Sequence, residues 1–226
     1  MGQPEVFQSS IGKKAVAAIT GLVLFGFVVG HLLGNLQIFM GPGPINAYAE
    51  KLRHLGMLLW AVRFFLLLAL MIHIGVTLQL ARENRRARPV PYKYQDTIQA
   101  TKASRTMIVS GIGLFAFIVY HLMHFTLCTT NPEFAYLKDS LGRHDVYAMM
   151  VLGFKNPVVS TAYVVAIGAL CFHLTHGLSS YPQSFGFNNE NCMPVFQYLG
   201  YAAAFLIFVG YVSIPVAVLL NFVKLL

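Results

Sequence analysis

The sequence predicts an all-α integral membrane protein, a five-helix bundle that forms one domain over residues 1–226 and contains an internal two-helix repeat. Composition is the first reason: 57% of the residues are hydrophobic and only 11% are charged, as in membrane proteins. The second is five stretches without Asp, Glu, Lys or Arg, each close to or longer than the roughly 20 residues that cross a bilayer. The third is a repeated segment with one histidine per copy.

The first half of the chain predicts two spanning helices. The first is expected over residues 15–40, after a polar arm in which Ser9 or Ser10 supplies the N-cap. Two glycines and two prolines at positions 41–44 end this helix. The apolar residues that follow suggest a short helix at the membrane interface, before a second span over residues 57–81.

The connector over residues 82–105 fixes the expected orientation. It carries seven basic residues against two acidic ones, and such loops stay in the cytoplasm. The N-terminus is therefore expected on the cytoplasmic side. The remaining spans are expected over residues 104–129, 157–180 and 194–222, with Pro182 ending the fourth and Pro215 kinking the fifth.

Charge and cysteine content exclude other classes of site. We attribute the net charge of +8 to membrane topology, so no nucleic-acid partner is expected. The three cysteines are far apart and form no C-x-x-C motif, which predicts neither a zinc site nor a disulfide framework.

The internal repeat joins two histidine-containing segments. Residues 21–32 and 111–122 are identical at seven of twelve positions, and the identities include His31 and His121. A fainter similarity links the residues before His73 to those before His173. Because a polar ring in lipid needs a partner, a repeated histidine in such helices indicates function.

Depth along the helices predicts how these four histidines pair. At roughly 1.5 Å per residue, His31 and His121 both lie about 12–15 Å from the outer helix ends, and His73 and His173 about 14 Å from the inner ends. The pairs would be His31 with His121 and His73 with His173. Four membrane histidines arranged in this way predict two haems, each held between two of them, and an electron path across the membrane. A bare zinc or copper site fits two depths poorly.

Three further residues have open roles. His124 and His176 each lie three positions after a predicted ligand, and we interpret them as groups that contact the ligands or the haem propionates. Arg63, the one charge away from the ends of the expected spans, either reaches the outer interface or pairs with a propionate.

Several motifs resemble the dihaem cytochrome b membrane anchor of succinate dehydrogenases and fumarate reductases, in the type with a single five-helix anchor. The resemblance covers essentially the whole chain. It rests on the segments Ser9–Lys14, Ile19–Leu22, Gly30–Leu36, Ala103–Met107, Tyr120–His124 and Phe172–Leu178. In that family the haem ligands match His31, His73, His121 and His173.

The resemblance implies a larger complex in the bacterial cytoplasmic membrane, often as a dimer of complexes. An iron–sulfur subunit would dock on the cytoplasmic face and carry a flavoprotein that interconverts succinate and fumarate. The inner haem b would be proximal to the iron–sulfur subunit and the outer haem b distal. Menaquinone or another quinone would react within the membrane, and this chain would hold no dicarboxylate site.

Glu50 is the predicted proton donor for the quinone. Quinone reduction needs such a group near the carbonyl oxygens, and Glu50 is the carboxylate nearest in sequence to the outer ends of the first two helices. Asn35 and Gln37 are expected at the same opening. The alternatives are that all three are interface residues, or that quinone reacts at an inner site near Ser10 and Arg105.

Other functions stay open at this point. A haem b anchor of a hydrogenase or formate dehydrogenase also combines membrane histidines with quinone chemistry. A transporter also uses inward-facing histidines and repeats, and a passive anchor would have lost its haem. Haem content separates the haem-free functions from the others.

Overall fold

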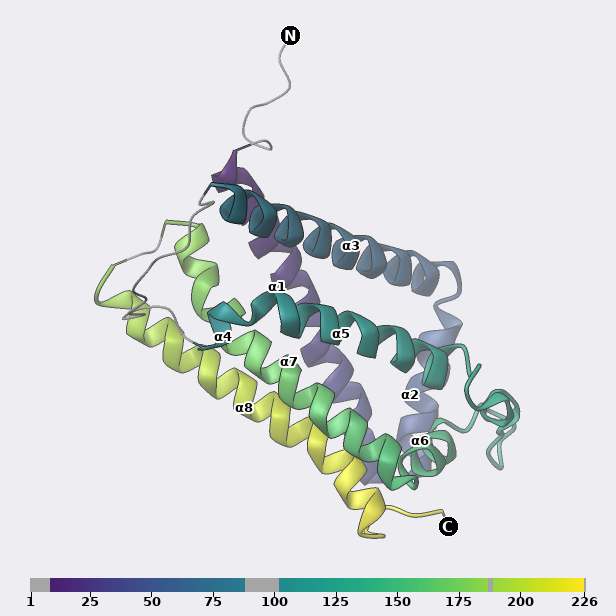
Figure 1. The fold of residues 1–226 in the computed structure, drawn as a ribbon. Helices are drawn as coiled ribbons and strands as arrows, with labels where there is room; N and C mark the ends of the chain where they lie inside the picture. Colours follow the sequence, from purple (N-terminus) through teal and green to yellow (C-terminus); the bar gives the residue numbers. More distant parts are fainter. Residues whose placement is uncertain (1–8, 88–101, 187–188, 226) are drawn as a thin grey trace.

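Five long helices dominate the computed structural model, which describes residues 9–87, 102–186 and 189–225 (Figure 1). They are α1 (Ser10–Asn35), α3 (Met57–Arg86), α5 (Met107–His121), α7 (Pro157–Ser184) and α8 (Cys192–Leu219). Shorter helices are α2 (Pro42–His54), α4 (Lys102–Arg105) and α6 (Val146–Phe154). The 3-10 turns η2 (Leu36–Met40) and η4 (Pro132–Tyr136) and the π-helical turn η3 (Leu122–Thr126) complete the described elements.

Each long helix, with η2 continuing α1 and η3 continuing α5, is long and apolar enough to cross a membrane. This confirms the predicted all-α class with five spans. The charged connector between α3 and α4 lies mostly outside the described residues, so the cytoplasmic position of the N-terminus stays a prediction.

Local signals in the sequence start and stop the first helices. The Ser9 side chain accepts a hydrogen bond from the Gly12 amide at 3.0 Å, which confirms the predicted N-cap. Gly41 breaks the helix with φ at 95°, a conformation that favours glycine. Pro42 then occupies the first turn of α2, where its missing N–H costs nothing. The short helix expected after this break is therefore present.

Several helix ends differ from the predicted positions. α1 begins at Ser10 and α3 continues to Arg86, so both helices extend beyond the uncharged stretches. The added turns are held together where Lys13 pairs with Glu83 at 2.5 Å. Pro182 lies inside α7 and does not end it. Residues 130–156, expected as a loop, contain η4 and α6.

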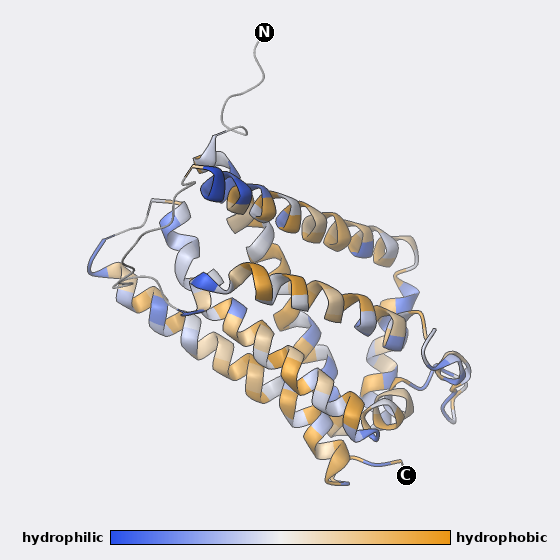
Figure 2. Cartoon of the chain, in the orientation of Figure 1, coloured by the Kyte–Doolittle hydropathy of each residue, from blue (hydrophilic) through white to orange (hydrophobic). Residues whose placement is uncertain are grey.

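The helices pack around α1. It contacts α3 most extensively and also packs against α7 and α8, while α7 lies along α8 and also packs on α5. Figure 1 shows α7 and α8 side by side, with α3 on the opposite side of the bundle. The buried residues between α1, α7 and α8 include Leu32, Ile167 and Ile207. Figure 2 shows apolar residues along the long helices and polar ones towards their ends.

The end of the bundle that carries α2 and α6, called the α2–α6 end below, has its own buried cluster. Asn46 of α2 is fully buried. Its amide nitrogen donates to Asp145 at 3.0 Å and to Asp139 at 3.3 Å, and its amide oxygen accepts from the Tyr147 amide at 3.0 Å. One side chain therefore ties α2 to the segment that leads into α6, and Arg143 completes the cluster by pairing with Asp139 at 2.7 Å.

Candidate functional site

Each predicted ligand histidine lies on a different long helix. His31 is on α1, His73 on α3, His121 at the end of α5 and His173 on α7. The rings of His31 and His121 lie close together and nearly perpendicular, with centroids 5.9 Å apart and planes at 82°. Two imidazoles on opposite sides of one iron, each bound through a metal–nitrogen bond of about 2 Å, have centroids roughly 6 Å apart. The distance therefore fits bis-histidine ligation, although it also suits an edge-to-face contact.

The second pair lies closer to the N-terminal end of α1. His73 and His173 are close enough to interact electrostatically. Each ring contacts a hydroxyl on the neighbouring helix, Thr20 of α1 at 3.1 Å from His73 and Ser110 of α5 at 3.0 Å from His173. Hydrogen bonds of this kind orient metal-binding histidines.

Tyr163 of α7 connects His121 to His124. Its hydroxyl lies 3.3 Å from Nδ1 of His121 and 3.0 Å from Nδ1 of His124. His124 is 1% exposed and belongs to the π-helical turn η3; such turns are frequent at functional sites. The structure thus connects His124 to the predicted ligand His121 through the hydroxyl of Tyr163. His176 lies close enough to His173 for an electrostatic interaction.

The contact of Arg63 is with an aromatic side chain of its own helix. Arg63 is exposed on α3, and its guanidinium lies over the Trp60 ring, 5.1 Å from the centroid. A cation over an aromatic face at this distance is favourable, and tryptophan is enriched at membrane interfaces. This arrangement favours the interface role of Arg63. Its pairing with a haem propionate stays a prediction.

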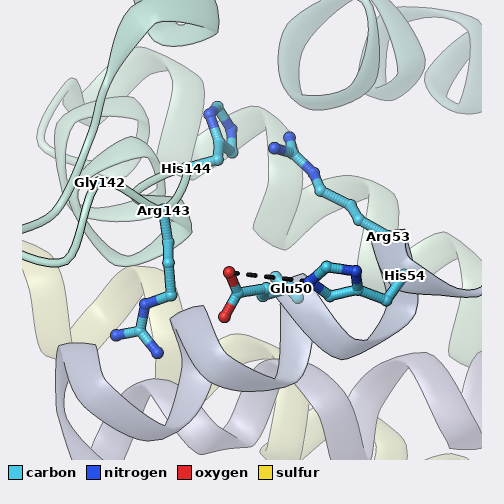
Figure 3. Close-up of a pocket in the computed structure, with 7 residues that line it drawn as sticks. Glu50, Arg53, His54, Gly142, Arg143 and His144 are labelled. Atoms are coloured by element: carbon cyan, nitrogen blue, oxygen red, sulfur yellow. Dashed lines mark ion pairs between the residues drawn. The ribbon is translucent and has the colours of Figure 1, made fainter.

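Glu50 lines a pocket at the α2–α6 end (Figure 3). The pocket has a volume of about 270 Å³ and is lined by Ala49, Glu50, Arg53, His54, Gly142, Arg143 and His144. Figure 3 shows α2 supplying Glu50, Arg53 and His54, with the segment before α6 on the other side. Asn35 and Gln37 are not among the lining residues, so they do not share this opening with Glu50 as expected.

The pocket is rich in positive charge. Burial and then the charge of Arg53 hold the pKa of His144 below 6.5, which keeps its ring neutral at pH 7. Glu50 meets His54 at 3.9 Å, and both side chains are substantially exposed. Such a pair contributes little to stability, so the Glu50 carboxylate is available to a bound molecule.

Sequence reasoning missed Tyr163, Thr20 and Ser110. The signal for the last two was present, because Thr20 and Ser110 occupy equivalent positions of the repeat, immediately before Gly21 and Gly111. Both are hydroxyl residues but are not identical, so a count of identities passes over them. Tyr163 has no hydroxyl counterpart, since the equivalent residue in the other half is Arg63.

The fold and the site together define a class, a polytopic helical membrane protein whose histidines approach one another between helices. The family model for the succinate dehydrogenase/fumarate reductase transmembrane subunit matches residues 81–212, more than half of the chain. The chain belongs to this family. It is a multi-pass membrane subunit of such a complex, which associates with flavoprotein and iron–sulfur subunits. Neither a curated protein nor a solved structure shows significant similarity to it.

Proposed function

We propose that this chain carries two b-type haems and passes electrons between the iron–sulfur subunit and quinone in the membrane. Family membership favours this function over an anchor of another dehydrogenase or a transporter. The matched region contains His121 and His173, but it begins at residue 81, after His31 and His73. The proposal for His31 and His73 therefore rests on the repeat and on the geometry.

The observation that carries the proposal is the close approach of the His31 and His121 rings, whose centroids are 5.9 Å apart. His73 and His173 form the second pair, each held by a hydroxyl of the adjacent helix. Bis-histidine iron leaves no open position for oxygen or substrate, so a haem bound in this way supplies electron transfer. The chain's own part is to hold four ring nitrogens in place and to exclude water from them.

The orientation assigns each pair to a partner. With the N-terminus in the cytoplasm, the His73–His173 haem is proximal to the iron–sulfur subunit and the His31–His121 haem is distal. The complex would lie in a bacterial cytoplasmic membrane and use menaquinone as its quinone, with the dicarboxylate chemistry in the flavoprotein. A dimer of complexes is part of the same proposal.

Glu50 would exchange the proton that quinone chemistry requires on the distal side. Its carboxylate faces a pocket that also contains Arg53 and His144, and the Arg53 guanidinium supplies donors for a quinone oxygen. Arg143 is already engaged, because it pairs with Asp139 at 2.7 Å. The pocket thus supplies one proton-exchanging acid beside hydrogen-bond donors.

Haem content tests the electron-transfer proposal. A pyridine haemochrome assay with a reduced-minus-oxidised spectrum should give two low-spin haems b per chain in the purified complex. His73→Ala and His121→Ala should each lose one haem, whereas His54→Ala, which changes an exposed side chain, should keep both. A folded, assembled complex without haem would overturn the proposal.

Steady-state kinetics test the role of Glu50. Glu50→Gln should slow quinone-linked turnover but leave succinate oxidation with a soluble dye unchanged, because the dye bypasses this subunit. Glu133→Gln, which alters an exposed carboxylate at the same end, is the matched control. Equal quinone turnover in both variants would exclude Glu50 as the proton donor.

A further inference from the structure

Thr20 and Ser110 form the same contact in the two halves of the chain. Thr20 Oγ1 lies 3.1 Å from Nδ1 of His73, and Ser110 Oγ lies 3.0 Å from Nδ1 of His173. The two hydroxyl residues are ninety positions apart, as are His31 and His121. In each half, the hydroxyl of the first helix thus meets the histidine of the second.

The bonds around Thr20 determine which nitrogen of His73 carries the proton. The Thr20 hydroxyl donates its one hydrogen to the Val16 carbonyl at 2.7 Å, so it offers a lone pair to the ring. The Ala17 carbonyl, 3.1 Å from the same Nδ1, only accepts. Nδ1 of His73 must therefore be the N–H donor, and in a neutral ring this leaves the lone pair on Nε2.

Ser110 produces the same state in the other half. When its hydroxyl donates to the Met107 carbonyl at 3.1 Å, its oxygen accepts from Nδ1 of His173 at 3.0 Å. The neutral His173 ring then also has its lone pair on Nε2. Both histidines present the same nitrogen for a metal, and neither arrangement needs a charged ring.

Glycine makes room for the His73 ring beside the hydroxyl, whereas the His173 ring does not depend on it. A Cβ on Gly21 would lie 3.2 Å from Cε1 of His73, and a Cβ on Gly111 would lie 3.6 Å from Cε1 of His173. The hydroxyl fixes one edge of the ring and the glycine backbone lies against it. The hydroxyl is thus shared by both sites, and the need for glycine is specific to the His73 site.

We propose that Thr20 and Ser110 are the positioning residues of the inner haem: each holds Nδ1 of its histidine as the N–H donor, Thr20 together with the Ala17 carbonyl, and so sets the basicity of the ring. This inference rests on the bis-histidine haem proposed above. The outer pair differs, because His121 is held by a phenol, Tyr163, at 3.3 Å. Changes at Thr20 and Ser110 should therefore act on one haem and leave the other as an internal reference.

The test uses the assembled complex with Thr20→Val or Ser110→Ala. A hydrogen bond from Nδ1–H raises ligand basicity and favours ferric iron, so its loss in Ser110→Ala should raise the midpoint potential of the inner haem in a redox titration. Thr20→Val keeps the Ala17 carbonyl on Nδ1 of His73 and should raise the potential less. The variants should also release haem to excess apomyoglobin about 10–100-fold faster. The outer haem should keep its potential and its ferric electron-paramagnetic-resonance signal.

Matched controls come from hydroxyls on the histidine helices themselves. Thr77 donates to the His73 carbonyl at 2.7 Å and Thr175 to the Phe172 carbonyl at 2.7 Å. Thr77→Val and Thr175→Val should leave both potentials unchanged. Thr20→Ser and Ser110→Thr keep a hydroxyl and should restore the wild-type potential.

The outcomes separate this inference from the proposed function. Wild-type complex without haem overturns both. Two haems in the wild type, with an inner potential in Ser110→Ala no different from that in Thr175→Val, overturn the positioning role alone. An equal shift of both haems also overturns it. If Thr20→Val does not assemble, Ser110→Ala, which removes one oxygen atom, decides the question.

Discussion

Asn46→Ala tests whether one buried amide holds the α2–α6 end together. The substitution removes the acceptor of the Tyr147 amide and the donor to Asp145 and Asp139. Both carboxylates keep other partners, since Asp145 accepts from Ala148 and Asp139 from Arg143. The main losses are the acceptor of the buried Tyr147 amide, at about 1–3 kcal/mol, and the shorter of the two charge-assisted bonds, at about 1.5–3 kcal/mol, so the total is about 2.5–6 kcal/mol.

A loss of this size is measurable as a melting temperature. For a chain of this length it corresponds to a decrease of roughly 5–25 °C, read as heat-induced aggregation of the purified complex in detergent. Asn131→Ala is the matched control, because its amide bonds the exposed side chains of Thr130 and Glu133. An Asn46→Ala decrease no larger than that of Asn131→Ala would refute the reasoning.

Three further predictions concern the glycine contact, the phenol bridge and acid stability. Gly21→Ala should lower the inner haem content, because its Cβ would lie 3.2 Å from the His73 ring; Gly111→Ala, with an ordinary 3.6 Å contact, should retain haem in the same haemochrome assay. Tyr163→Phe removes the oxygen shared by two histidines, so a redox titration should show a raised potential for the outer haem only. Burial raises the pKa of Asp139, but hydrogen bonds outweigh it and hold the pKa below 3.8; because the unfolded state then binds this proton more tightly, stability should fall as the pH drops below about 4. Asp139→Asn should remove that part of the pH dependence of the melting temperature, and an unchanged profile would contradict this assignment.

The sequence was sufficient for the spanning helices because long apolar runs in a membrane protein have one stable solution. A bilayer cannot hydrogen-bond the backbone, so each run must satisfy its own amides as a helix. Helix ends were less predictable: α3 extends to Arg86, beyond the uncharged run, because polar residues continue a helix readily once it leaves lipid. α6 was missed because its nine residues, Val146–Phe154, are too few and too uniformly apolar to show a helical period.

The candidate site was predictable only in part. The histidines could be found because a polar ring in an apolar repeat is conspicuous, and depth arithmetic placed His31 beside His121 as the structure has them. The role of Tyr163 could not be predicted, because it depends on which face α7 presents to the π-helical turn η3. The pocket around Glu50 depends on a contact between α2 and residues 142–144, which lie about ninety positions away in the chain.

The bridge from Tyr163 to His124 has a consequence for how two similar halves came to differ. If the halves were separate, identical chains in a symmetric dimer, every substitution would appear at both sites. Within one chain, the position equivalent to Tyr163 can be occupied by Arg63, and the position equivalent to His124 by Gly34. Because both halves lie in one chain, the two sites can differ, and each of the two proposed haems can have its own affinity for an electron.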